Sequence, residues 1–247
     1  KKTKPNLNKP SMNTQKRNDL ICFGLLLLAL IIVRYVIVLG PETTMLQSQR
    51  SLFSWQAIGI IGLLGLAGVY MLNQTGLRKL WDAGVGTGRK TILPFAAGLL
   101  LGAIQSIYDF FTGAGDKIAA SMGLEGMHID FPFSIPIYTG GAIIVSTLYY
   151  LVPISLVVFL LSTKILKGKA EGAVFWTVGI LIAVFEPLTN PGISVIQDVG
   201  LVAVPLSLSV LVFNLAAIYS IRRFGFVAAI FLRLGHYAVW HVIYPFF

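Results

Sequence analysis

The chain alternates long runs of apolar residues with short polar segments. Seven of these runs are expected to be membrane-spanning helices, at roughly 20–39, 53–72, 91–110, 138–163, 173–189, 197–220 and 225–246. A helix of about 20 residues crosses a hydrocarbon core of ~30 Å. A closed barrel would also satisfy the backbone in lipid, but the sequence lacks the alternation that barrel strands need. The pattern predicts an all-α integral membrane protein, a polytopic bundle of about seven transmembrane helices.

Composition leads to the same class of protein. Hydrophobic residues make up 56% of the chain and charged residues 12%, with a mean hydropathy of +0.81. Soluble domains contain about 25% charged residues. The basic segment 1–19 precedes the apolar run 20–39 and could be the start of a signal peptide, but no small-residue cleavage site follows. We therefore expect a basic cytoplasmic tail at 1–19, a retained anchor, and a single transmembrane domain at 20–247.

The distribution of Lys and Arg predicts how the chain is oriented. With the N-terminus inside, the inner segments 1–19, 73–90, 164–172 and 221–224 hold six, four, three and two of these residues. The outer segments 40–52, 111–137 and 190–196 hold only Arg50 and Lys117. This asymmetry follows the positive-inside rule, so we expect the N-terminus inside and the C-terminus outside.

The net charge of +9 is thus mostly an orientation signal that faces anionic lipid. We expect membrane lipids and another membrane protein as partners, and no nucleic acid. The expected location is a bacterial-type plasma membrane or an equivalent energy-transducing or internal membrane. The glycine-rich stretch GVGTGRK at 84–90 lacks the length of a phosphate-binding loop.

The outer segment 111–137 is unusually long. Ile118, Met122 and Leu124 suit a short helix lying at the membrane interface, with Asp116 and Lys117 at its start. Two interpretations are open: a simple re-entry loop, or a lid over an outward-facing cavity.

Ionisable residues inside apolar runs are functional candidates because they are costly in a bilayer. Beyond Arg34, which can extend outward to the interface, they are Asp109, Glu186, Asp198, Arg233, His236 and His241. Asp198 is expected in the first turn of the sixth run, where the helix dipole favours an anion.

The last run carries three of these residues. At about 100° per residue, Arg233, Tyr237, Trp240 and Tyr244 form one stripe, and His236 and His241 lie on opposite sides of it. Two His residues that share a zinc ion on one helix are spaced i, i+4, whereas these are spaced i, i+5. We expect no metal site and no cofactor. Either His could ligate a haem or a chlorophyll, but nothing in the sequence selects that role.

Arg233 needs an anion, since an unpaired buried cation is very costly. We expect Glu186 as its partner, or Asp198 through water. The hypothesis is a polar cluster of Arg233, Glu186 and His241, with Tyr149 or Tyr150 as a hydrogen-bond partner. Such a cluster could be functional, or it could be a satisfied polar plug that holds the bundle together.

From about residue 76 to 247 the chain resembles the CPBP superfamily, the CAAX protease and bacteriocin-processing membrane proteins, also called glutamic-type intramembrane proteases. TGLRKLWDAGVGTGRKTILPFAAGLLLGAI resembles the stretch before that family's core. STLYYLVPISLVVFLLS stands where the family has its paired-glutamate motif, EExxxR. VGILIAVFEPLTN is similar to its FxxxH motif, and GFVAAIFLRLGHYAVWH is similar to the final HxxxN span.

The family's catalytic residues are mostly replaced. Tyr149 and Tyr150 stand in place of the glutamates and Ile154 in place of the arginine. Phe185 and His236 match their motifs, but Thr189 replaces a His and Trp240 an Asn. The resemblance implies that the family uses a glutamate to activate water, and a tyrosine is no carboxylate base.

Three functions follow. The first is a catalytically silent CPBP-like protein that binds or scaffolds a partner membrane protein or lipid. The second is an intramembrane protease with rearranged residues, with Glu186 as the base and His236 or His241 in support. The third is a small transporter, with Pro153, Pro187 and Pro205 as helix breaks at a site.

Overall fold

The computed structural model describes residues 12–39, 50–124, 126–189 and 193–247, and every regular element in these ranges is helical. Six helical stretches are long and apolar enough to span a membrane: Met12–Leu39, Trp55–Asn73, Thr87–Thr112, Ser134–Ile165, Leu201–Phe224 and Phe226–Phe246. The chain is thus an all-helical, polytopic membrane protein. Which end faces inward stays a prediction.

The fifth expected span, 173–189, coincides with a shorter helix, α9 (Glu171–Pro187), of 17 residues. At 1.5 Å per residue its length is about 26 Å, slightly less than the ~30 Å of a hydrocarbon core. It packs along α11 (Val204–Phe224), where Gly179 lies against Ile218. The α9 helix therefore belongs to the bundle, although its length alone would not identify it as a span.

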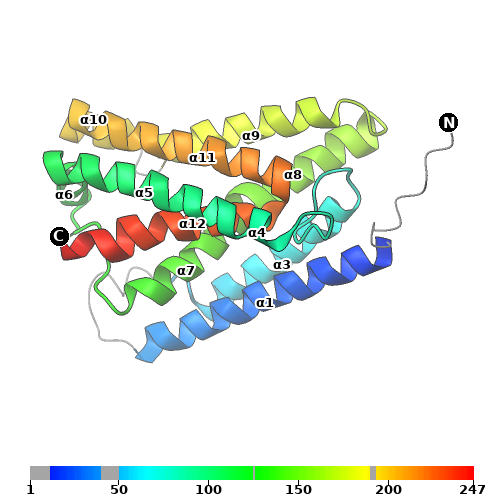
Figure 1. Ribbon diagram of the computed structural model, residues 1–247, viewed down its shortest axis with the longest axis horizontal. Helices are drawn as coiled ribbons and strands as arrows, with labels where there is room; N and C mark the ends of the chain where they lie inside the picture. The colour runs from blue at the N-terminus through cyan, green and yellow to red at the C-terminus, as the bar shows by residue number, and fades with distance from the viewer. Residues whose placement is uncertain (1–11, 40–49, 125, 190–192) are drawn as a thin grey trace.

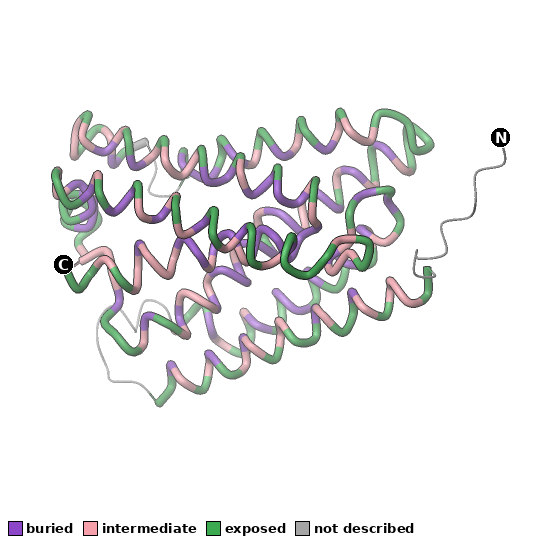
Figure 2. The backbone as a smooth tube through the Cα atoms, viewed as in Figure 1, coloured by how far each residue is buried: buried purple, intermediate pink, exposed green. Residues whose placement is uncertain are grey.

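The long helices run roughly side by side in one bundle (Figure 1). In this view α1 (Met12–Leu39) and α3 (Trp55–Asn73) lie along one side, and α9 and α11 lie along the other. Between them are α5 (Ile92–Thr112) and α12 (Phe226–Tyr237), the central pair. Figure 2 shows buried positions turned toward the interior and exposed positions on the outer helix faces, as expected for a bundle surrounded by lipid.

Short elements cap the two ends of the bundle. At one end lie α6 (Ala114–Ser121), α10 (Ile193–Val199) and the C-terminus, near the turn η4 (Leu201–Ala203). The loop 74–86 is at the opposite end, followed by α4 (Thr87–Lys90). The described parts of the predicted outer segments 111–137 and 190–196 thus share one end with the C-terminus.

Two of the long helices contain wider π-helical turns. The fourth predicted span is α7 (Ser134–Val145), η1 (Ser146–Leu151), α8 (Val152–Val157) and η2 (Val158–Ile165) in sequence. The last span continues from α12 through η5 (Ala238–Ile243) to the 3-10 turn η6 (Tyr244–Phe246). Single π-turns within helices often mark functional sites. Tyr149 and Tyr150 lie in η1, and His241 lies in η5.

The central pair packs through glycines. A Cβ atom on Gly98 of α5 would overlap the carbonyl oxygen of Leu232, and one on Gly235 of α12 would overlap that of Phe95. A Cβ on Gly102 would come within 2.7 Å of the His236 carbonyl oxygen. Small residues at such positions let helix backbones approach closely, which drives association in membranes. These glycines fix α12, and the polar residues it carries, against α5.

The end of the bundle that carries the loop 74–86 is called the basic end here. Hydrogen bonds that the sequence does not reveal stabilise it. Residues 1–11 of the expected tail lie outside the described residues, and the remainder of that tail is helical, because α1 begins at Met12. Asp19 is buried and accepts the amide N–H of Trp81 at 3.0 Å. The Lys79 ammonium donates to the carbonyls of Leu72 and Thr75, at the end of α3. Burial lowers the Lys79 pKa below its usual value.

Candidate functional site

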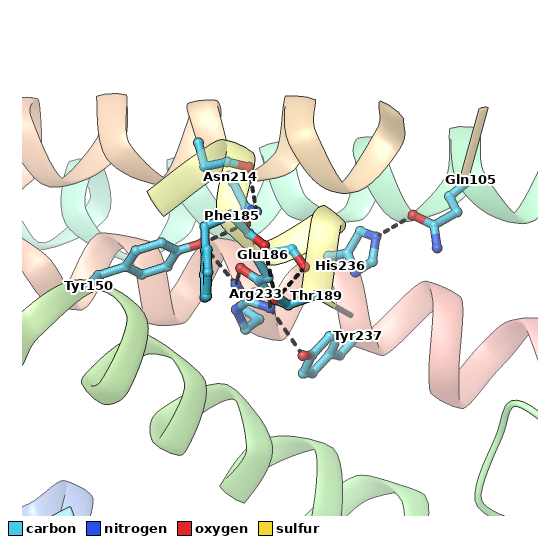
Figure 3. A network of polar contacts seen from close by, with 10 residues as sticks. Gln105, Tyr150, Phe185, Glu186, Thr189, Asn214, Arg233, His236 and Tyr237 are labelled. Carbon is cyan, nitrogen blue, oxygen red and sulfur yellow. Dashed lines mark hydrogen bonds and ion pairs between the residues drawn. The ribbon is translucent and has the colours of Figure 1, made fainter. Parts of the chain in front are cut away.

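An ion pair between α9 and α12 forms the centre of the site (Figure 3). Nη1 of Arg233 lies 3.2 Å from Oε1 of Glu186, and Nη2 lies 3.2 Å from Oε2. The side chains are 5% and 7% exposed. This two-point contact joins the planar guanidinium to the planar carboxylate. Of the two anions predicted for Arg233, the structure selects Glu186.

Two tyrosines accept further hydrogen bonds from the guanidinium. Arg233 donates to the Tyr150 hydroxyl at 2.8 Å and to the Tyr237 hydroxyl at 3.2 Å. The Tyr150 hydroxyl in turn donates to Oδ1 of Asn214 at 2.7 Å. The Arg233 guanidinium also lies over the Phe213 ring, 4.7 Å from its centroid. A buried charge is tolerable when it is paired and hydrogen-bonded in this way, and Nε of Arg233 is the one guanidinium nitrogen that has no partner among the described residues. Of the two tyrosines in η1, Tyr150 is the partner.

A second polar group lies one turn further along α12. Nε2 of His236 is 3.1 Å from Oε1 of Gln105 on α5, and the Ser209 hydroxyl is 2.7 Å from the same oxygen. His236 is 7% exposed, and its Nδ1 has no hydrogen-bond partner among the described residues. Figure 3 shows this pair beside the Arg233 network. The free ring nitrogen can bond to a ligand or to water.

His241 belongs to a third group, on the opposite side of α12. Its Nδ1 lies 3.1 Å from Nδ1 of His128, in the segment between α6 and α7, and its ring stacks on Tyr138 at 4.0 Å between centroids. One neutral ring must donate and the other accept. Burial lowers the His128 pKa to about 4, which keeps that ring neutral at ordinary pH. His236 and His241 thus have different hydrogen-bond partners.

Residues from all three groups line one cavity of about 220 Å³. Its polar wall carries Glu186, Arg233 and Gln105, together with His236 of α12 and His241 of η5. Its apolar wall includes Leu206, Val210 and Phe213 of α11. Ile118, Met122 and Leu124, which the sequence assigns to a short interfacial helix, also line the cavity. Because α6 ends at Ser121, Met122 and Leu124 lie after this helix and not on it. Ligand pockets typically combine an apolar lining with a few converging polar groups.

An apolar cavity of about 390 Å³ adjoins the first one. The two share Leu124, Met127, Tyr237 and His241 as lining residues. Tyr149 lines this second cavity and makes no hydrogen bond through its hydroxyl to any residue in the described ranges. Tyr237 and His241 therefore stand between a polar-walled cavity and an apolar one.

The predicted role of Asp198 is corrected by the structure. It lies on α10 and is exposed, outside the first turn of α11, and no contact joins it to Arg233. The separation of α10 from α11 has a physical cause. Gly200 has a φ of 83°, a left-handed conformation that ends α10 before the next helix starts. Asp109 is buried, and its carboxylate accepts the amide N–H of Gly115 at the start of α6.

Several site residues escaped the sequence reasoning. Gln105, Asn214 and Ser209 are uncharged polar residues within apolar runs, so a search limited to ionisable groups passes over them. His128 is one of only three histidines in the chain, and that scarcity was the available signal. Thr189, which stands where the resemblance expects a His, donates its hydroxyl to the Phe185 carbonyl at 2.9 Å.

Metal binding finds no support in the geometry. Within residues 12–39, 50–124, 126–189 and 193–247, no three His, Cys, Asp or Glu side chains come together in a way that could hold a metal ion.

Comparison of the chain with protein-family models, curated proteins and solved structures gives no match. The resemblance to the CPBP superfamily therefore stays a prediction.

Proposed function

We propose that this chain is a catalytically silent membrane protein that binds an apolar segment of a partner, either a lipid chain or a transmembrane helix of another protein. The observation that carries the proposal is the cavity between α6, α11 and α12, with its mostly apolar lining and the free Nδ1 of His236. We place it in a bacterial-type plasma membrane, or an equivalent energy-transducing or internal membrane, with its N-terminus inside.

The hydrogen bonds between Glu186 and Arg233 favour a binding function over hydrolysis. A general base must have a lone pair within hydrogen-bond reach of the water it activates. Both carboxylate oxygens of Glu186 already accept hydrogen bonds from Arg233 at 3.2 Å. No hydrogen bond within the described ranges joins Glu186 to His236 or His241. If the chain shares ancestry with the CPBP superfamily, the fold would be kept without the chemistry.

The test is to identify what co-purifies with the protein. The native protein is extracted in mild detergent, and bound lipids and proteins are identified by mass spectrometry. We expect a stoichiometric lipid or protein partner. Val210→Trp should displace it, because Val210 lines the cavity and a Trp side chain would fill much of it. Ile104→Trp is the matched control, since Ile104 is exposed on α5, beside the lining residue Gln105 but outside the cavity.

A wild-type protein that carries no stoichiometric partner would contradict the proposal, as would a partner that both Trp variants retain. Hydrolysis is the second candidate, because Glu186, His236 and His241 line one cavity. Cells that express the wild type or Glu186→Gln would then differ in the new N-termini of their membrane proteins. Identical sets of N-termini would exclude this candidate.

A further inference from the structure

A second binding site lies at the basic end of the bundle, away from the cavity described above. It is a water-accessible pocket of about 410 Å³, lined by Gly76, Leu77, Arg78 and Asp82 from the loop after α3, and by Arg222 and Arg223 from the end of α11. The pocket thus combines three guanidinium groups with one carboxylate. Its lining carries a net positive charge, contributed by two segments far apart in the sequence.

Two of the three arginines have no anionic partner. Arg78 forms an ion pair with Asp82 at 3.2 Å. In the part of the chain that the structure describes, neither Arg222 nor Arg223 takes part in an ion pair or a hydrogen bond through its side chain. The Arg222 guanidinium lies over the Phe175 ring, 5.5 Å from its centroid, which restrains its orientation. The nearby Glu171 forms no ion pair with either arginine among the described residues; its carboxylate accepts the Gly76 amide at 2.7 Å.

A stripe of exposed apolar side chains on α11 leads to this pocket. Leu208, Val212, Leu215 and Tyr219 are 53%, 52%, 40% and 51% exposed. Their spacing places them, together with Arg222 and Arg223, within a sector of about 100° around the helix axis. One face of α11 is thus apolar along its length and cationic at its end, with a tyrosine between, the order found at a membrane interface.

From this arrangement we infer that Arg222, Arg223 and the neighbouring Arg78 bind the phosphate of an anionic phospholipid whose acyl chains lie along the stripe of α11. The guanidinium group of an arginine can bind two phosphate oxygens at once. The two unpaired guanidinium groups of the pocket therefore recognise the lipid phosphate. A headgroup with a net negative charge lowers the positive charge of the pocket, and a zwitterionic headgroup leaves that charge unchanged. The inference is independent of the proposed function, since the cavity lies at the opposite end of the bundle.

The experiment titrates the purified full chain in detergent with phosphatidylglycerol or with phosphatidylcholine of the same acyl chains, and counts bound lipids by native mass spectrometry. We expect phosphatidylglycerol to bind roughly tenfold more tightly or better, because the two unpaired arginines attract its net negative charge. The double variant Arg222→Gln, Arg223→Gln should lose this preference. The control Lys164→Gln, Lys169→Gln removes the same charge from exposed positions at the same end, outside the pocket, and should keep it.

Other outcomes would overturn the inference. If the arginine variant keeps the preference, or if the lysine control loses it equally, the preference is diffuse electrostatics and not a site. A parallel titration with inorganic phosphate tests the source of the anion. Full displacement of phosphatidylglycerol by phosphate, with no loss of lipid binding in Leu215→Ala, Tyr219→Ala, would make a free anion the ligand. Melting temperatures of all variants confirm that each one folds.

Discussion

Arg233 and Glu186 face each other across the interface between α12 and α9, joined by two contacts of 3.2 Å and almost fully withdrawn from solvent. They are 47 residues apart in the sequence. The pair links two helices whose apolar faces alone would not fix their rotation or depth, because lipid tails are as apolar as the helix surfaces. The same two side chains form the polar wall of the cavity.

Removing one member of this pair should cost more than removing both. Arg233→Leu or Glu186→Leu leaves the other charge buried without a partner, and we expect each to lower the free energy of unfolding by about 3–5 kcal/mol. The double variant should recover most of that loss. Denaturant-induced unfolding in detergent micelles measures all three proteins. Arg78→Ala is the control, since its exposed ion pair with Asp82 is worth at most about 1 kcal/mol.

The two adjacent tyrosines of η1 should respond differently to loss of the hydroxyl. Tyr150→Phe removes an acceptor from Arg233 and a donor to Asn214, and leaves both polar groups buried. We expect a loss of about 1–3 kcal/mol. Tyr149→Phe should change stability by no more than ~0.5 kcal/mol, because the structure shows no described residue bonded to its hydroxyl. Equal effects on the unfolding free energy would contradict the network in Figure 3.

Glycines of the central helix pair should not tolerate even a methyl group. Gly98→Ala or Gly235→Ala puts Cβ onto a backbone carbonyl of the partner helix, so α5 and α12 must separate. We expect a loss of about 1–3 kcal/mol or more from this overpacking. Gly59→Ala is the control: nothing lies within 4 Å of its added Cβ, and a helical alanine should be neutral or stabilising by ~0.5–1 kcal/mol. Melting temperatures of the purified variants distinguish these outcomes.

Acid should destabilise the protein through His128. Burial lowers the pKa of this ring to about 4, below the ~6.5 of an exposed histidine, while Asp109 and Asp116 act weakly in the opposite direction. The unfolded chain therefore binds the proton first. This contribution to stability is complete above about pH 6.5 and is lost as the pH falls toward about 4, by at most about 3 kcal/mol.

The measurement is the melting temperature of the wild type and of His128→Gln between about pH 7 and about pH 4. Glutamine cannot titrate, so the variant should show a shallower decline over this range. Parallel pH profiles for the two proteins would show that His128 does not supply the acid sensitivity, and that other groups do.

The class of the protein and most of its candidate spans could be predicted from local patterns in the sequence. A bilayer demands about 20 apolar residues in a helical segment, so each span can be recognised locally. The sequence also limited the partners of Arg233 to a few carboxylates, because a buried cation requires one. Which carboxylate lies next to it depends on how α9 and α12 pack, and local residues do not encode that.

Tertiary structure decided the rest. Gly200 separates Asp198 from α11, the π-turns change the angular positions of Tyr150 and His241, and the approach of α5 brings Gln105 to His236. The His128–His241 contact joins residues 113 positions apart. These relationships depend on contacts between segments distant in the sequence, and a helical period of 3.6 residues carries no information about which neighbour a given face will meet.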